Sequence, residues 1–345
     1  DTLRFTSASA DVDDADFANV VTDSIEVIEL TGDGDTSLTL GSAGDAATAG
    51  LTITGADQTD SASGDSIDVS GMTEAVTITA GDGADTVTGG SGNDTITGGT
   101  GDDSLSGGSG DDTFIAEDTD TITGDGGSDT VRFDAAVSAS NLTNSDLQTV
   151  ESVEITNTGD AAYDFSAQSE SLSITGNSGA DTITGGSAAD TIDGGDGDDI
   201  FIAEDADTIT GGAGSDTVRF AANVSASNLT NNDLQSTETI EITNTGSGTY
   251  DFNVQTEDLT ITGTGNADTI TGGTGSDTLN TGAGDDTLIY TDGSDLGNDT
   301  SVDGSAGTDT LRFTSASADV DDEDFANVAA NSIEEIELTG NGDTS

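Results

Sequence analysis

Hydrophobic and polar residues alternate along this chain in short runs, which Gly, Asn and Asp interrupt at regular intervals. Alternation with a period of two predicts a β-strand with one buried face, and short strands between turn residues are typical of an all-β solenoid or sandwich. Four strands open with the pattern D-T-[LV]-R-F, at residues 1–5, 129–133, 216–220 and 309–313. Helical periodicity is nearly absent, so the sequence predicts an all-β fold.

The four opening strands divide the chain into modules. Module one spans residues 1–128, module two spans 129–215, module three spans 216–308, and residues 309–345 begin the next copy. Residues 309–345 repeat residues 1–37 with six differences, so the period is 308 residues. A period of this kind indicates a tandem array, and we expect further copies in a longer protein.

A finer repeat of nine residues lies inside the modules and follows the pattern G-G-x-G-x-D-x-U-x, where U is apolar. Unbroken copies occupy residues 80–115, 176–202 and 263–289, and single copies occupy 124–132, 211–219 and 304–312. Gly permits positive φ, so each copy predicts a tight turn with its carbonyl groups pointing to one spot. The Asp at the sixth position adds a carboxylate, and such oxygen ligands suit Ca²⁺.

The apolar residue of each copy predicts a short strand with its side chain in the core and its Thr or Ser neighbours outside. These inward residues are Val87, Ile96, Leu105, Phe114, Ile183, Ile192, Phe201, Ile270, Leu279 and Leu288.

The nonapeptides resemble the RTX (repeats-in-toxin) family of secreted bacterial proteins. The resemblance implies a parallel β-roll, or β-helix solenoid, in which two nonapeptides form one coil and Ca²⁺ binds between turns on the same side of successive coils. Its implied metal ligands are the sixth-position Asp residues, namely Asp85, Asp94, Asp103, Asp112, Asp129, Asp181, Asp190, Asp199, Asp216, Asp268, Asp277, Asp286 and Asp309.

The resemblance further implies that copies two apart form pairs. The implied pairs are Asp85 with Asp103, Asp94 with Asp112, Asp181 with Asp199, Asp268 with Asp286, Asp112 with Asp129, and Asp199 with Asp216. Asp190 and Asp277 would contribute half-sites. Ala188 stands where the pattern has Gly and conflicts with the turn that contains Asp190.

Composition narrows the function. The 345 residues include 69 acidic residues, four Arg, no Lys, and no Cys or His, which gives a net charge of −65. Without Cys or His there is no thiolate or imidazole metal site and no Ser-His or Cys-His pair, so we expect no enzyme and no catalytic residue within the chain. Four Arg cannot bind nucleic acid through its phosphates, and no apolar run approaches a membrane span.

Low hydrophobicity with high net charge is by itself typical of disorder. The periodic Gly and Asp instead indicate a chain that folds around several Ca²⁺ ions per chain. We therefore expect circular dichroism to show a large loss of β-structure after chelation.

The leading hypothesis is a calcium-stabilised extracellular structural protein: a repetitive fibre, surface layer or adhesin stalk on a bacterial cell surface. Its expected partners are further copies of itself and calcium-bridged cell-surface groups. The alternative is a secretion module of an RTX enzyme or toxin, exported by type I secretion, with its catalytic part outside this chain. A weaker alternative is an ice-binding solenoid built on outward Thr residues.

Two structural expectations accompany these hypotheses. The four Arg recur at one module position, and each is expected to pair with a Glu of the following strand, as Arg132 with Glu154. The outward Thr ladders, such as Thr86 and Thr88, should be about two rungs long because only alternate nonapeptides share a face.

Overall fold

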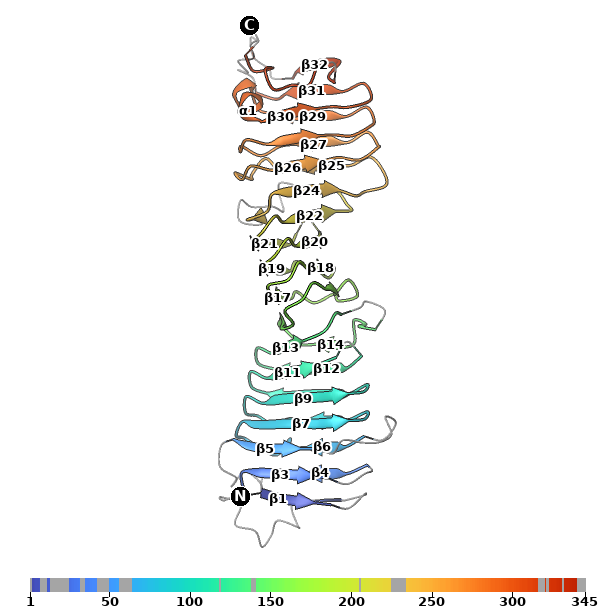
Figure 1. Ribbon diagram of the computed structural model, residues 1–345, viewed down its shortest axis with the longest axis vertical. Coiled ribbons are helices and arrows are strands. Elements are labelled where there is room, and N and C mark those ends of the chain that lie inside the picture. Colours follow the sequence, from blue (N-terminus) through green and yellow to red (C-terminus); the bar gives the residue numbers. More distant parts are fainter. Residues whose placement is uncertain are drawn as a thin grey trace. The chain divides into compact units, whose positions relative to one another are not determined.

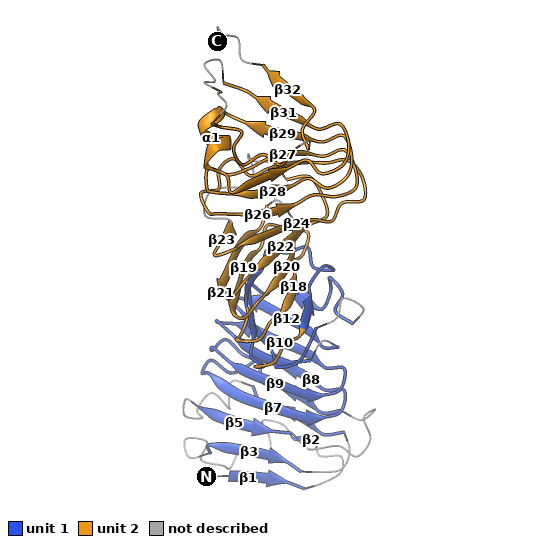
Figure 2. Cartoon of the chain, turned by 45° about the horizontal axis from the view of Figure 1, so that its top comes forward, with its two compact units in different colours: residues 1–157, 162–175 blue, residues 158–161, 176–345 orange. Residues whose placement is uncertain are grey.

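The computed structural model describes most of the chain. The described residues are 2–6, 11–12, 25–31, 35–41, 50–55, 64–117, 119–137, 141–204, 206–224, 234–315, 320, 323–330 and 332–339. They form two compact units, the first comprising residues 1–157 and 162–175 and the second comprising residues 158–161 and 176–345 (Figure 2). Each unit is an all-β solenoid, as the sequence predicts.

The first unit has two stacks of parallel strands (Figure 1). One stack runs in the order β1 (Thr2–Phe5), β3 (Val27–Leu30), β5 (Leu51–Thr54), β7 (Val76–Asp82), β9 (Thr95–Thr100), β11 (Thr113–Ala116), β13 (Thr130–Phe133), β15 (Ser152–Ile155) and β17 (Ser173–Thr175). The other contains β2 (Asp11–Val12), β4 (Ser37–Thr39), β6 (Ser66–Asp68), β8 (Thr86–Thr88), β10 (Ser104–Ser109), β12 (Thr121–Gly126) and β14 (Leu147–Gln148). Strand β16 (Ala162–Asp164) lies beside Val137 through a parallel bridge at Tyr163.

The second unit repeats this arrangement. One stack contains β18 (Thr182–Thr184), β20 (Ile200–Ala203), β22 (Thr217–Phe220), β24 (Thr239–Ile242), β26 (Thr260–Thr262), β28 (Thr278–Asn280) and β30 (Ser301–Asp303). The facing strands are β19 (Thr191–Asp196), β21 (Thr208–Ala213) and β23 (Leu234–Gln235), then β25 (Thr249–Asp251), β27 (Thr269–Thr271), β29 (Thr287–Tyr290), β31 (Thr310–Phe313) and β32 (Glu335–Leu338).

Alternate strands along the chain pair because each coil crosses to the other face and back. Strand β7 pairs with β9, and β8 pairs with β10, in register and parallel. The short helix α1 (Gly293–Asn298) interrupts this pattern, with Asp292 accepting hydrogen bonds from the N–H groups of Ser294 and Asp295. No helix in the part of the chain that the structure describes is both long and apolar enough to span a bilayer.

The core is a column of apolar side chains between the two strand stacks of each unit. All ten inward nonapeptide residues predicted from the pattern are at most 1% exposed. Aromatic side chains widen the core where the nonapeptides stop, and Phe133 packs against Phe165 with ring centroids 6.2 Å apart. Phe220 and Phe252 repeat this contact at 6.0 Å in the second unit.

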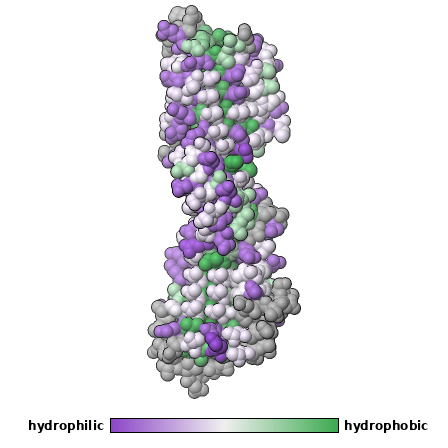
Figure 3. Space-filling model, in the orientation of Figure 1, coloured by the Kyte–Doolittle hydropathy of each residue, from purple (hydrophilic) through white to green (hydrophobic). Residues whose placement is uncertain are grey.

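The outer surface is mostly polar. Hydrophilic and intermediate residues cover much of the face in Figure 3, and the apolar patches on that face are narrow. Among the described residues, the large apolar side chains that are exposed are Ile115, Ile202, Ile336 and Leu338. This distribution agrees with inward apolar positions flanked by outward Thr and Ser.

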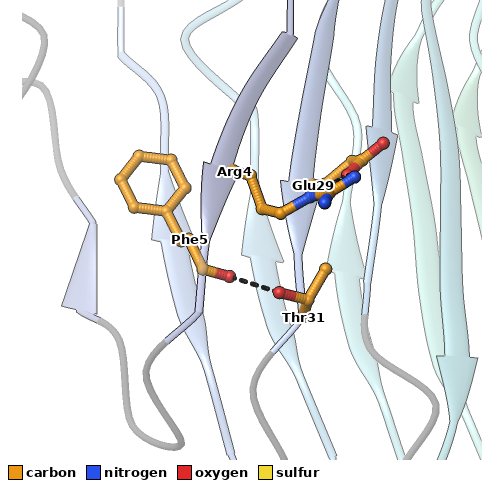
Figure 4. A network of polar contacts seen from close by, with 4 residues as sticks. All are labelled: Arg4, Phe5, Glu29 and Thr31. Atoms are coloured by element: carbon orange, nitrogen blue, oxygen red, sulfur yellow. Dashed lines mark hydrogen bonds and ion pairs between the residues drawn. The ribbon is translucent and has the colours of Figure 1, made fainter.

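Every Arg pairs with a Glu on the neighbouring strand, as predicted. Arg132 Nε donates to Glu154 Oε2 at 2.6 Å, and the same contact joins Arg219 to Glu241. Arg4 lies over Glu29 in Figure 4, beside the hydrogen bond from Thr31 Oγ1 to the Phe5 carbonyl. The fourth pair is Arg312 with Glu337.

The prediction of two-rung Thr ladders is wrong in both units. In the second unit the register aligns Thr217, Thr239, Thr260 and Thr278 into a four-rung ladder. In the first unit the register aligns Thr52, Thr77, Thr95, Thr113 and Thr130 into one five-rung ladder. Strands outside the nonapeptide block join the same sheet, because only the alternation of apolar and polar residues, and not the nonapeptide turn, is needed to extend it. The neighbouring column reads Thr54, Thr79 and Thr97 before Ile115 replaces Thr.

Candidate metal centre

The sixth-position Asp residues stack along the sides of each unit. In every stacked pair the backbone N–H of one Asp donates to Oδ1 of the Asp one coil later, and we call this series the Asp ladder. The pairs, donor first, are Asp85 and Asp103 at 2.8 Å, Asp94 and Asp112 at 2.7 Å, Asp112 and Asp129 at 2.8 Å, Asp181 and Asp199 at 2.8 Å, Asp199 and Asp216 at 2.8 Å, Asp268 and Asp286 at 2.7 Å, and Asp286 and Asp309 at 2.8 Å. All the pairs implied by the resemblance are therefore neighbours.

All thirteen Asp residues are buried, with at most 2% of each residue exposed. They occupy the point where each turn enters its strand, so the apolar residue two positions later anchors the turn in the core. Leu105 and Phe114, for example, are buried directly after Asp103 and Asp112.

The Asp ladder also contains members outside the nonapeptide pattern. Asp103 N–H donates to Asp120 Oδ1 at 3.0 Å, and Asp65 N–H donates to Asp85 Oδ1 at 2.6 Å. Asp190 and Asp277, predicted as half-sites, likewise have ladder partners. Asp190 N–H donates to Asp207 at 3.0 Å, and Asp277 N–H donates to Asp299 at 3.1 Å.

A signal for three of these extra members is present in the sequence. Asp120 and Asp207 are each followed by Thr-Ile-Thr, and Asp65 is followed by Ser-Ile-Asp, which matches the last four positions of a nonapeptide. The glycines of the turn are missing there, so the full pattern does not recognise them.

The second carboxylate oxygen divides the ladder into two classes. Nine Asp residues have an Oδ2 that is buried and has no hydrogen-bond partner: Asp85, Asp103, Asp112, Asp129, Asp181, Asp199, Asp216, Asp286 and Asp309. A buried carboxylate oxygen without a donor is costly, by about 1–3 kcal/mol or more for a charged group. These nine oxygens are therefore the atoms that a bound cation would satisfy.

In the other class, which we call closed turns, the turn itself satisfies Oδ2. The N–H at the second position of the turn donates to it: Gly90 to Asp94 at 2.8 Å, Gly186 to Asp190 at 2.6 Å, and Gly273 to Asp277 at 2.8 Å. Thr264 donates to Asp268 through its N–H and its hydroxyl. In closed turns Oδ2 already accepts a hydrogen bond, so a cation would have to displace that N–H donor. The prediction that Asp94, Asp190, Asp268 and Asp277 bind calcium stays a prediction.

Most turns of the first class have residues at positive φ in the second and fourth positions, and we call them open turns. Gly99 and Gly101 have φ of 116° and 132°, whereas Gly90 and Gly92 of a closed turn have no positive φ. Open turns also stack closely. A Cβ on Gly99 would lie 1.7 Å from the carbonyl oxygen of Gly81 one coil earlier. Only Gly fits both the dihedral angle and this approach.

The stacked turns bring an Asp oxygen and a carbonyl oxygen close to one place, at the closed turn of Gly89 as well as at open turns. A Cβ built on Gly194 would lie 2.3 Å from Asp199 Oδ2 and 2.7 Å from the carbonyl oxygen of Gly211 in the next turn. Both oxygens therefore lie close to the first position of the turn. This pairing of a hard carboxylate with a carbonyl suits Ca²⁺.

Burial sets the electrostatics of the ladder. Desolvation raises the pKa of Asp85 to about 7, and it raises the pKa of Asp112 and Asp199 to about 6. The N–H group that donates to each Oδ1 opposes the rise, and neighbouring carboxylates add to it. Groups with these properties favour either a proton or a metal cation.

Carboxylates alone do not build the site. Within the described ranges, no three acidic side chains come together as a metal-binding cluster. A Ca²⁺ ion takes 6–8 oxygen ligands, so the carbonyl groups of the stacked turns must supply most of them. The unpartnered Asp oxygens and the adjacent carbonyl groups fit this requirement.

Comparison with known families supports this interpretation of the turns. The RTX calcium-binding nonapeptide repeat (4 copies) matches residues 69–96, 79–114, 116–135, 175–205, 203–222 and 262–297. The chain carries RTX calcium-binding repeats. The RTX matches include open and closed turns alike, and they include Asp120 and Asp207, which lack the glycines. No curated protein matches the chain.

Proposed function

We propose that this RTX solenoid is a calcium-stabilised extracellular structural protein, forming a repetitive fibre, surface layer or adhesin stalk. The observation that carries the proposal is the set of buried Asp Oδ2 atoms in the stacked turns, which have no hydrogen-bond partner among the described residues. The tandem period of 308 residues supports a repetitive assembly. Secretion from a bacterial cell is part of the proposal, because RTX repeats occur in secreted bacterial proteins.

Calcium binding supplies enough free energy to stabilise the fold. Extracellular calcium modules have dissociation constants of about 10⁻⁴–10⁻³ M. A site of about 0.1 mM in about 10 mM Ca²⁺ contributes roughly 2.7 kcal/mol, so six sites contribute on the order of 15 kcal/mol. That is comparable with the whole stability of an ordinary domain. The metal therefore decides whether this highly charged chain folds.

Removal of calcium should unfold most of the solenoid. We expect the β-signal in circular dichroism to collapse after exhaustive dialysis against chelator and to return when millimolar Ca²⁺ is added. Magnesium is the matched control, because it demands near-ideal octahedral geometry and dehydrates reluctantly, so it should restore little structure. An unchanged spectrum after calcium removal would contradict the proposal.

The structural role is tested by imaging. Electron microscopy of the native material should show fibres or a lattice in calcium and their loss in chelator. Soluble particles of single chains in both conditions would contradict self-association.

The alternative, a secretion module of an RTX enzyme or toxin, differs in its genetic context. A structural protein predicts further copies of the 308-residue period in the complete gene. A single copy joined to a protease or lipase domain would favour the secretion module.

One observation favours the ice-binding alternative more than the sequence does. The Thr ladder that begins at Thr52 is five rungs long, but Ile115 ends the adjacent column. Thermal hysteresis of the calcium-loaded protein tests this function directly. A plain calcium scaffold should show none.

A further inference from the structure

Each of three Asp ladders ends on a Glu that lies outside the nonapeptide pattern. Asp129 N–H donates to Glu151 Oε2 at 2.8 Å, and Asp216 N–H donates to Glu238 Oε2 at 2.8 Å. Asp309 N–H donates to Glu334 Oε2 at 2.9 Å. In each case the Glu takes the place that the next Asp Oδ1 takes elsewhere in the ladder.

A backbone carbonyl group of the segment that contains the Glu also lies near the Asp carboxylate. A Cβ built on Gly124 would lie 2.2 Å from the Thr149 carbonyl oxygen and 2.3 Å from Asp129 Oδ2. On Gly211 the corresponding distances are 2.1 Å to the Ser236 carbonyl oxygen and 2.4 Å to Asp216 Oδ2.

The third ladder ends in the same way. A Cβ built on Gly304 would lie 2.1 Å from the Ser332 carbonyl oxygen and 2.7 Å from Asp309 Oδ2. The three places thus reproduce the convergence of carboxylate and carbonyl oxygens found between the consensus turns at Gly194.

At two of these places the backbone adopts a positive φ, as it does in an open turn. Thr149 and Ser236 have φ of 51° and 50°, although neither is Gly. A residue that is neither Gly nor Asn costs free energy in this left-handed region, so the surrounding contacts must hold it there. Glu151 and Glu238 follow Thr149 and Ser236 by two residues, whereas the Asp of a nonapeptide follows the first position of its turn by five. The extra methylene group of Glu compensates for this shorter turn.

The carboxylates at the ladder ends favour a bound cation or a proton. Asp129 Oδ2 is buried and has no hydrogen-bond partner, and Asp129 faces the carboxylates of Glu151, Asp111 and Asp125. Asp216 faces Glu238 and Asp198 in the same way. Arg132, the Arg of module two, forms its ion pair with Glu154.

We propose that Glu151, Glu238 and Glu334 are calcium ligands that close three terminal Ca²⁺ sites, shared with Asp129, Asp216 and Asp309. The three Glu residues lie outside every residue range that the nonapeptide family matches. Each Glu is solvent-exposed, so an ion can enter from its side. The inference rests on the proposed calcium function and adds three sites to those between the preceding turns.

The test counts calcium ions bound to the full chain by native mass spectrometry and by equilibrium dialysis with radioactive calcium. Gln at these positions keeps a carbonyl oxygen for the Asp N–H but removes the charge. We expect Glu151→Gln to bind one ion fewer than the wild type and the double variant Glu151→Gln/Glu238→Gln to bind two fewer. The control Glu170→Gln/Glu257→Gln removes the same charge elsewhere and should bind the wild-type number.

The outcomes separate this inference from the proposed function. If the wild type binds calcium and the double variant binds the same number with equal affinity, each Glu is only a hydrogen-bond acceptor and the inference is overturned. If the wild type binds no calcium, the proposed function itself fails. Circular dichroism in saturating calcium checks that both double variants are folded, and a folded variant lacking two ions supports the inference.

Discussion

The two oxygens of a ladder carboxylate have different partners, and this difference separates the candidate calcium ligands from the purely structural Asp residues. Oδ1 of Asp112 accepts the Asp94 N–H, while Oδ2 is buried with no hydrogen-bond partner. Asp94 has the same Oδ1 contact with Val76 N–H, but its Oδ2 accepts the Gly90 N–H. The same residue type at the same repeat position therefore serves two purposes.

We predict that Asp112→Asn removes one calcium ion and Asp94→Asn removes none. Asn keeps the Oδ1 acceptor and replaces Oδ2 by an NH₂ group, which repels a cation at position 112. Loss of a site of about 0.1 mM affinity in about 10 mM Ca²⁺ costs roughly 2.7 kcal/mol of stability. Calorimetric titration should count the ions. Equal losses in the two variants would show that closed turns open to bind calcium.

Sequence reasoning predicts which Asp residues belong to the stacked turns, but it predicts neither their burial nor their two states. Asp94 and Asp103 both follow a complete G-G-x-G turn, yet the first turn is closed and the second open. The difference lies in the layer beneath. Gly90 and Gly92 lie against the backbone at Met72 and Glu74, whereas Gly99 and Gly101 lie against the carbonyl groups of another Gly turn. A local pattern contains no information about the coil that lies beneath it.

The turn is the element that transmits order from one coil to the next, because its Gly residues touch the carbonyl groups of the turn before it. A Cβ on Gly101 would lie 1.9 Å from the Gly83 carbonyl oxygen, at a φ of 132°. Gly265 belongs to a closed turn, and a Cβ there would meet nothing within 4 Å. Gly101 occupies the consensus fourth position of its turn and Gly265 the variable third position, and their structural demands are unequal.

Gly101→Ala should destabilise the calcium-loaded protein, and Gly265→Ala should not. Ala at a positive φ typically costs more than about 1 kcal/mol, and the contact with Gly83 adds to this cost. Ala at Gly265 reduces the entropy of the unfolded chain, so it should be neutral or slightly stabilising. Thermal unfolding in constant calcium measures both, and equal melting temperatures for the two variants would refute the argument.

Strands are the elements that the sequence predicts best, because alternation and burial coincide in them. The Arg–Glu pairs follow from the same register, since Arg132 and Glu154 are directly opposite on β13 and β15. The helix α1 was not predicted, because Asp292 supplies a cap for only six residues and no apolar period marks them. The length of the Thr ladder was missed because Thr52 and Thr77 lie outside the nonapeptide copies but extend the same sheet.

The whole molecule carries a net charge of −65, and its buried Asp residues make the charge dependent on pH. Burial raises the pKa of Asp85 to about 7 and that of Asp112 and Asp199 to about 6, from about 3.9 in an unfolded chain. The folded, metal-free state therefore binds more protons than the unfolded state between about pH 4 and pH 7. Its stability is greatest below that window and is lost as the pH rises through it.

Calcium should reverse this dependence. Metal binding requires the ionised carboxylates, so affinity rises with pH across the same window. We expect calcium-depleted protein to retain more β-structure at pH 4.5 than at pH 8, and calcium-loaded protein to retain more at pH 8. Circular dichroism of dialysed samples measures both series, and parallel pH profiles with and without calcium would contradict the assignment of these Asp residues as ligands.

The hydrogen bonds of the ladder all point the same way along the chain. Each Asp N–H finds its acceptor one coil later, between Asp85 and Asp103 or between Asp129 and the terminal Glu151, 18 and 22 residues onward. A chain that emerges N-terminus first must wait about one coil before each turn is complete, whereas a chain that emerges C-terminus first has the acceptor ready. The ladder thus gives folding a direction, and the end of the chain that is free first determines whether the Glu is present before or after the turns next to it form.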